Sequence, residues 1–272
     1  MNERKEASTT EQEPRQTNED TAVGSSSSSQ SATAVDFARL VGKLKTTPRT
    51  GWVRRGVPRY ESVADHSWRV ATLSLLLFGR NDDNFDAPKC IQMALVHDLA
   101  ECLVGDIVPD DNISAESKQK MEHDAMIRIA TTLGQACPND HARQHLLDLF
   151  DEYEKRESLE SKAVKDLDLL DMIIQADEYE QAFGHDLSEF FQGTPVSRFG
   201  DATIQAVARQ VHEQRQERLQ KENTDVTRKD PFALSKKDQA FVSEYAKASN
   251  LSADAVQQTI KALRDWENGG SK

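Results

Sequence analysis

The chain has 272 residues, of which 37% are hydrophobic and 29% are charged, and its formal net charge is −12. This charge repels polyanions, so we expect no binding to nucleic acid polymers. No apolar stretch approaches the roughly 20 residues that span a bilayer, so we expect no membrane association and an intracellular, cytoplasmic protein, with a nuclear location also compatible.

Three parts follow one another along the chain. Residues 1–34 are rich in Ser, Thr, Glu and Gln, so they bury too little surface to offset ordering and should form a disordered leader. Residues 35–222 show helical periodicity and no alternating strand pattern, which predicts one all-α domain. Residues 223–272 should form a polar linker and a short helical extension, which either docks on the domain, binds a partner or stays loosely held.

The periodicity of apolar residues predicts seven helices in the central part. A loop with Pro48 and Gly51 follows the first helix, and the second begins at Ser62, a residue type that caps helices well. The third is apolar on nearly every side, which is typical of a central element surrounded by other helices. The expected helices begin at 35, 62, 87, 114, 141, 159 and 199, and the third should extend unbroken to 104.

A basic segment lies between the first two helices. Residues 39–60 contain seven Lys or Arg residues and no acid, interleaved with Trp52 and Tyr60. One interpretation is a solvated basic loop, and the other is a small site for an anionic ligand with an aromatic wall.

The three cysteines are Cys90, Cys102 and Cys137. They form no CxxC pair, and their odd number favours reduced thiols over a disulfide framework. Cys102 lies in an apolar helix with no adjoining cation, so we expect it to pack in the core and not to act as a nucleophile.

Ionisable residues interrupt apolar faces in two of these helices. His66 lies in one helical stripe with Val63 and Val70, and a lone buried histidine is usually structural. It is not alone, because His97, Asp98 and Glu101 occur in the most apolar helix. Their spacings of three and four residues place them on neighbouring faces of one surface.

Burying unpaired carboxylates would cost several kcal/mol each, so a cation must compensate. A divalent metal would account for the imidazoles and the acids together. Asp168 lies in an apolar row of the 159–184 helix and is a further candidate ligand, with Asp171 a weaker rival, whereas Asp166 and Asp177 should be solvated. Two imidazoles and two carboxylates would form an open, mixed N/O site and not a closed zinc site.

The set His66, His97-Asp98 and Asp168 resembles the H…HD…D signature of the HD-domain metal-dependent phosphohydrolases. Three stretches narrow the resemblance to the HD-domain 5'-deoxynucleotidases of the eukaryotic type. They are RTGWVRRGVPRYESVADHSWRVA, ALVHDLAECLVGDI and VKDLDLLDMIIQADEYE. The resemblance covers roughly residues 35–220.

This resemblance implies an all-α HD-domain helical bundle with a buried metal site. It also implies hydrolysis of deoxyribonucleoside 5'-monophosphates to deoxynucleoside and phosphate, commonly by a homodimer. The divalent ion would be Mn, Co or Mg in the first place, with Zn or Fe as alternatives. The residues that match the family's metal ligands are His66, His97, Asp98 and Asp168.

Further roles carry over by motif. Glu101 and Asp106 would either move protons and orient water or hold a second ion together with the Ile107 carbonyl. Trp52 matches an aromatic residue near the sugar. Bacterial relatives carry an arginine where this chain has Gly51, so Arg49 or Arg54 would bind the phosphate instead.

Two other functions stay open. One is a different HD phosphohydrolase activity, on a phosphodiester or a modified nucleotide. The other is a metal-stabilised helical scaffold without turnover, whose C-terminal helices bind a partner.

Overall fold

The computed structural model describes residues 26–79, 84–137, 140–222 and 244, with side chains described from residue 34 onward. Throughout these ranges the regular structure is helical, and the nearest approach to a strand is an isolated bridge between Pro48 and Ser62. The prediction of an all-α fold is therefore confirmed. No described helix combines the length and the apolar character that a bilayer crossing requires.

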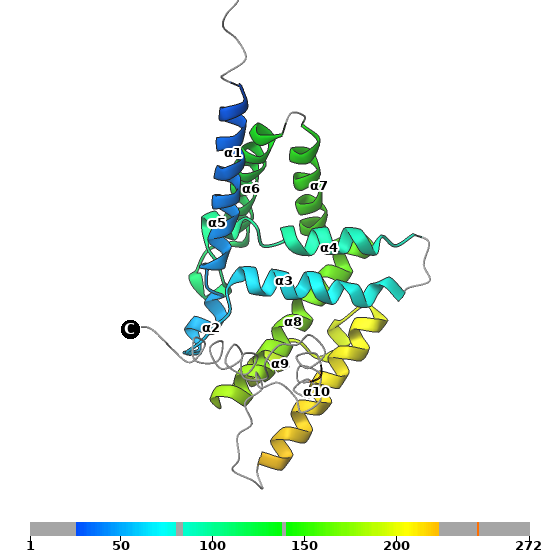
Figure 1. The fold of residues 1–272 in the computed structure, drawn as a ribbon. Helices are drawn as coiled ribbons and strands as arrows, with labels where there is room; N and C mark the ends of the chain where they lie inside the picture. The colour runs from blue at the N-terminus through cyan, green and yellow to red at the C-terminus, as the bar shows by residue number, and fades with distance from the viewer. Residues whose placement is uncertain (1–25, 80–83, 138–139, 223–243, 245–272) are drawn as a thin grey trace, which may run out of the picture.

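The helices fall into two groups, one on each side of the pair formed by α3 and α4 (Figure 1). The antiparallel helices α3 and α4 lie side by side across the middle of the molecule. Helices α1, α6 and α7 pack together on one side, and α8 runs past α3 and α4 to pack against α10 on the other. The elements are α1 (Ser26–Val41), η1 (Gly42–Lys45), α2 (Thr50–Arg54), α3 (Val63–Leu73), η2 (Ser74–Gly79), α4 (Ala87–Val96), α5 (Glu101–Val104), η3 (Pro109–Asp111), α6 (Ala115–Ala136), α7 (His141–Lys155), α8 (Leu159–Phe183), α9 (Ser188–Gly193), η4 (Val196–Arg198) and α10 (Ala202–Glu222).

Helix α8 is the centre of the domain, because it contacts α3, α4, α7, α9 and α10. Its apolar residues are buried on several faces, as a helix surrounded by others requires. Ser158 caps its first turn by accepting a hydrogen bond from the Ser161 N–H, and Gly184 ends it in the left-handed conformation at φ 69°. The fully buried residues include Val164, Leu167, Leu170 and Ile173.

The helix predicted over 87–104 is interrupted, which corrects that expectation. Helix α4 ends at Val96, and the chain then tightens into i→i+3 turns before α5. The Leu99 N–H donates to Val96 O at 3.0 Å and the Glu101 N–H to Asp98 O at 3.1 Å. Such tightened turns are often found at functional sites. Here they change the directions in which the side chains of residues 97–101 point, compared with a continuous α-helix.

Helix α1 begins at Ser26, and its later part packs against α6. Disorder of the leader over residues 1–34 stays a prediction. Residues 1–25 and the two helices expected in the C-terminal extension lie outside the described residues. The short helices α2 and α9 were not predicted, because neither is long enough to show a period.

Candidate metal centre

His66 lies in the first turn of helix α3 with its side chain turned into the core. Ser62 caps this helix and forms a capping box with Asp65, which fixes where the helix begins. Val63, His66 and Val70 have 0% exposure, so the stripe predicted from the sequence is the buried face. The ring of His66 therefore faces the helices that pack against α3, which are α4 and α8.

Four ligand atoms from three separate segments converge at this point. His66 Nε2 lies 3.3 Å from His97 Nε2 and 3.3 Å from Asp168 Oδ1. Asp98 Oδ2 lies 3.5 Å from His66 Nε2 and 3.2 Å from His97 Nε2. Ligand atoms held about 2.1 Å from one ion lie roughly 3.0–3.4 Å apart. His66, His97 and Asp98 are therefore brought together at a spacing that suits one divalent cation, and Asp168 approaches the same nitrogen of His66.

The second nitrogen of each imidazole is held by a neighbour. His97 Nδ1 lies 2.7 Å from the Ala94 carbonyl, which can only accept, so Nδ1 carries the proton and Nε2 keeps its lone pair. His66 Nδ1 bonds Asp171 Oδ2 at 2.7 Å, and Arg69 pairs with the other oxygen of Asp171. Partners of this kind orient metal-binding histidines. Asp171, the weaker rival for a ligand role, thus lies behind His66 and supports it.

The charges around the four atoms favour a cation. Burial opposes ionisation of Asp98, but His97 and Arg49 outweigh it and lower the pKa of this carboxyl below its usual range. Burial and Arg49 lower the pKa of His66, yet hydrogen bonds with Asp168 and Asp171 raise it to about 9. Asp168 and Asp171 thus favour positive charge at this point. The donor set and its charge fit a divalent metal ion.

Glu101 lies beside this cluster with an unsatisfied oxygen. Its side chain is buried, and Oε2 has no hydrogen-bond partner in the described part of the chain. Burial and the charges of Asp98 and Asp106 raise its pKa well above the usual range. A buried polar atom without a partner is costly, and a functional site is where such a cost is usually found.

Asp106 has a different setting. Gly105, at φ 75°, ends α5 and turns the chain back. Asp106 Oδ2 then accepts a hydrogen bond from the Thr50 N–H at 2.7 Å, and Thr50 Oγ1 donates to the Asp106 carbonyl at the same distance. This carboxylate therefore caps α2. The Ile107 carbonyl accepts a hydrogen bond from Lys118 Nζ at 2.9 Å, so a cationic group already occupies it.

The structure separates the candidate arginines. Arg49 Nη1 lies 3.1 Å from Asp98 Oδ2, within the cluster, whereas Arg54 pairs with Asp111 and, at 3.8 Å, with Asp110. The hydrogen bond from the Arg49 N–H to the Glu61 carbonyl, at 3.3 Å, fixes the loop against the start of α3. Of the two, Arg49 is thus the one beside the candidate metal ligands.

Trp52 is only 2% exposed, and its ring packs against Tyr179 and Phe190. Its indole N–H donates to Glu61 Oε1 at 3.0 Å, and the Glu61 N–H donates to the Tyr179 hydroxyl at 2.7 Å. Trp52 thus secures α2 to α8 and α9 from within the core. Glu61 was not predicted as part of this region, since it precedes the helix cap and belongs to no apolar row.

Two further neighbours of Asp168 escaped the sequence analysis. Tyr153 donates its hydroxyl hydrogen to Asp168 Oδ2 at 3.2 Å, and Lys165 Nζ lies 2.7 Å from the same oxygen. Lys165 could have been found, because residues three apart on a helix are neighbours. Tyr153 could not, because it lies on α7 and only tertiary packing brings it to α8.

Asp166 and Cys102 lie outside the cluster, and both are buried. Asp166 is buried and not solvated, since its Oδ2 accepts hydrogen bonds from the Gly200 and Asp201 N–H groups at 2.7 and 2.8 Å. The error arose because the turn that supplies these donors is distant in sequence. Cys102 is buried, and burial raises the pKa of its thiol to about 11, which fits a packing role.

Comparisons with known proteins agree with this geometry. The HD domain family model matches residues 41–196, more than half of the chain. The 5'-deoxynucleotidase HDDC2 of Danio rerio is 40% identical over 74% of this chain and 98% of its own length. The human 5'-deoxynucleotidase HDDC2 is 49% identical over 54% of this chain and 68% of its own length.

A solved structure supports the fold independently. The crystal structure of a predicted metal-dependent phosphohydrolase from Magnetospirillum magnetotacticum matches with a TM-score of 0.53 at 26% identity, over 70% of this chain and 94% of that one. Together with the converging His66, His97, Asp98 and Asp168, these similarities show that the chain belongs to the HD domain family and, within it, to the group of the 5'-deoxynucleotidase HDDC2 proteins.

Proposed function

We propose that this protein hydrolyses deoxyribonucleoside 5'-monophosphates to deoxynucleoside and phosphate. The observation that carries the proposal is the convergence of four ligand atoms beside Arg49 and Glu101, in a chain 40% identical to a 5'-deoxynucleotidase over nearly all of that relative. Such a site combines cation binding, phosphate binding and proton transfer within one buried cluster.

The residues that would hold a divalent ion are His66, His97, Asp98 and Asp168, with Mn, Co or Mg preferred and Zn or Fe as alternatives. The mixed nitrogen and oxygen donors support this choice, since no thiolate takes part. When bound, such an ion supplies acidified water and neutralises charge on the phosphoryl group. The chain's own residues must then bind the substrate and handle the proton.

Arg49 is the proposed phosphate-binding residue. Its guanidinium is held by Asp98 through one nitrogen and has further N–H donors that can bind phosphoryl oxygens. Arg54 is engaged by Asp110 and Asp111 and is therefore the weaker candidate. Trp52 would act indirectly, because its ring is buried and stabilises the segment that carries Arg49.

Glu101 is the proposed proton carrier. Hydrolysis forms a bond from phosphorus to a water oxygen and breaks the bond to O5', and a proton must pass from the water to O5'. The unsatisfied Oε2 of Glu101 can accept that proton and return it. Asp106 would orient the site through its bond to Thr50. A second ion at Glu101, Asp106 and Ile107 has less support, because Lys118 occupies the Ile107 carbonyl.

The decisive experiment is a metal-by-substrate screen with purified protein, in which phosphate release is followed. We expect release from dAMP in the presence of Mn, Co or Mg, and less from AMP. Release from a dinucleoside diester alone would favour the alternative HD phosphohydrolase. Bound metal without any release would favour the scaffold. Light scattering on the same sample tests the homodimer expected from the resemblance.

A further inference from the structure

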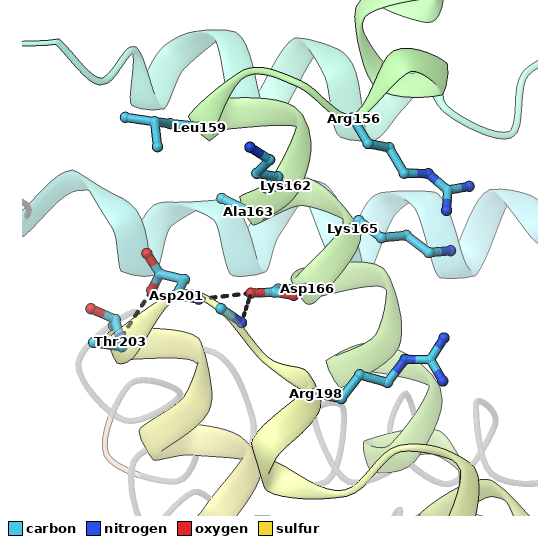
Figure 2. Close-up of a pocket in the computed structure, with 11 residues that line it drawn as sticks. Arg156, Leu159, Lys162, Ala163, Lys165, Asp166, Arg198, Asp201 and Thr203 are labelled. Carbon is cyan, nitrogen blue, oxygen red and sulfur yellow. Dashed lines mark hydrogen bonds between the residues drawn. The ribbon is translucent and has the colours of Figure 1, made fainter.

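A cavity of about 780 Å³ lies beside helix α8, away from the metal centre (Figure 2). Its walls come from α8, from the turn before it and from the segment that joins η4 to α10. A volume of this size is typical of pockets for small molecules. The residues that carry the argument are Arg156, Lys162, Lys165, Asp166, Arg198 and Asp201.

Helical geometry separates this cavity from the metal centre. Successive residues of an α-helix are about 100° apart, so residues two apart point to nearly opposite sides. Asp166 faces the cavity, and Asp168 faces His66. The cavity is therefore a distinct feature of the molecule, and none of the four candidate metal ligands lines it.

Four cationic side chains line the cavity, in a chain whose net charge is strongly negative. Figure 2 shows Arg156, Lys165 and Arg198, from three different segments, extending to the same side of α8. Within the described ranges, neither Arg156 nor Lys162 has a carboxylate within ion-pair distance. Arg198 bonds the Gly193 carbonyl through Nη1 and keeps other donors available.

The two acids of the cavity accept hydrogen bonds from backbone N–H groups. Asp166 Oδ2 accepts two backbone N–H groups, from Gly200 and Asp201. Asp201 Oδ1 accepts the Thr203 and Ile204 N–H groups, so it caps the first turn of α10. Both carboxylates are thus engaged by backbone donors of the cavity wall, and Arg156 and Lys162 are the cations best placed to bind a ligand, since Lys165 pairs with Asp168.

The position of Arg156 is a further sign of function. It ends α7 at φ 54°, in the left-handed conformation that helix ends usually reserve for glycine or asparagine. An arginine there costs conformational energy. The chain nonetheless carries a cationic side chain at this point, on the rim of the cavity.

We propose that this cavity is a binding site for a phosphate-bearing anion such as a polyphosphate or a nucleoside triphosphate, separate from the metal centre. Arginine and lysine donors from several segments are the groups that bind phosphate oxygens. Lys165 links the two sites, because it lines the cavity and its Nζ lies 2.7 Å from Asp168 Oδ2. An anion that draws Lys165 away would change the charge beside a candidate metal ligand, which makes the site a route for regulation.

Calorimetric titration of the full chain, stripped of metal and kept in chelator, tests this proposal without any dependence on hydrolysis. The probes are inorganic tripolyphosphate and dATP. We expect saturable binding, weakened more than about tenfold in Arg156→Glu/Lys162→Glu, because hydrogen bonds between charged groups contribute about 1.5–3 kcal/mol each. Tighter binding of dATP than of tripolyphosphate would identify a nucleotide, and equal binding a polyphosphate group alone.

Three further variants complete the test. Arg156→Gly removes the charge while suiting the left-handed backbone, so its binding defect cannot be ascribed to misfolding. Arg49→Ala, at the metal centre, should retain the binding. Lys120→Glu/Lys221→Glu makes the same change of charge on side chains that are 75% and 77% exposed elsewhere, and should also retain it. Absence of saturable binding in the native protein, or equal weakening in the control pair, would overturn the proposal.

Discussion

The two sides of helix α8 carry charge in opposite ways. On one side, Asp168 joins imidazoles and Asp98 in a buried cluster whose members bond one another. On the other side, Asp166 accepts hydrogen bonds from backbone N–H groups, and cationic side chains line an open cavity. These two aspartates are only two residues apart on one helix. The role of each acid therefore depends on the donors that packing brings to it.

Changing each aspartate to asparagine tests whether the two have different roles. Asp168→Asn should lower kcat/KM for dAMP by more than the roughly 10- to 100-fold that outer partners of metal ligands contribute, because a ligand itself is lost. Asp166→Asn should leave kcat/KM nearly unchanged. It should instead destabilise the fold by about 1–3 kcal/mol, since the Gly200 and Asp201 N–H donors lose a charged acceptor. Kinetics and urea unfolding of both variants would decide, and equal kinetic effects would refute the division.

A second comparison concerns Arg49, which precedes α2, and Arg54, which is the last residue of α2. Arg49→Lys should lower kcat/KM roughly 10- to 100-fold, because lysine cannot reproduce the paired geometry of the guanidinium beside Asp98. Arg54→Lys is the matched control and should change kcat/KM little, since its partners are Asp110 and Asp111. The reverse order of effects would assign phosphate binding to Arg54.

The support behind the metal centre can be tested separately. Asp171→Asn keeps the size of the side chain but removes the charge that holds His66 Nδ1. We expect Mn affinity to fall by about 10- to 100-fold. Titration of the stripped protein with Mn measures this effect, and an affinity equal to that of the native chain would show that Asp171 is purely structural.

The smallest expected effect is on the pH dependence of stability, away from both sites. Burial opposes the ionisation of Glu180, but hydrogen bonds from Arg215 and Arg218 lower the pKa of its carboxyl below the usual 4.5. A lowered pKa in the folded state means that this stabilisation is present above pH 4.5 and is lost as the pH falls through the lower, folded value.

Arg215→Met supplies the control for this prediction. The variant should be less stable at neutral pH, and its melting temperature should fall less steeply than that of the native chain below pH 4.5. Parallel melting curves for the two proteins across this range would show that Glu180 does not contribute.

Much of the metal centre could be predicted because its residues break helical periodicity. His66, His97, Asp98 and Asp168 stand where apolar residues belong, and the structure groups the first three around one point, with Asp168 beside His66. The same periodicity predicted most of the long helices. It failed at Val96, where the helix tightens.

What could not be predicted depends on contacts between distant segments. Glu61 meets Trp52 only because α2 folds back onto the start of α3. Asp166 was expected in solvent because the turn at Gly200 and Asp201 lies 34 and 35 residues away. The cationic cavity was missed for the same reason, since its arginines and lysines lie in segments whose exposed charges are ordinary on any helix surface.

We propose that one divalent ion, held by His66, His97, Asp98 and Asp168, is required for phosphate release from dAMP. The most direct test titrates the metal-stripped protein with Mn while metal content and phosphate release are measured together. We predict that activity rises in proportion to occupancy and saturates at one ion per chain, and that both signals are lost in His97→Ala. Full activity in the stripped protein, or an unchanged ion content in His97→Ala, would contradict this account.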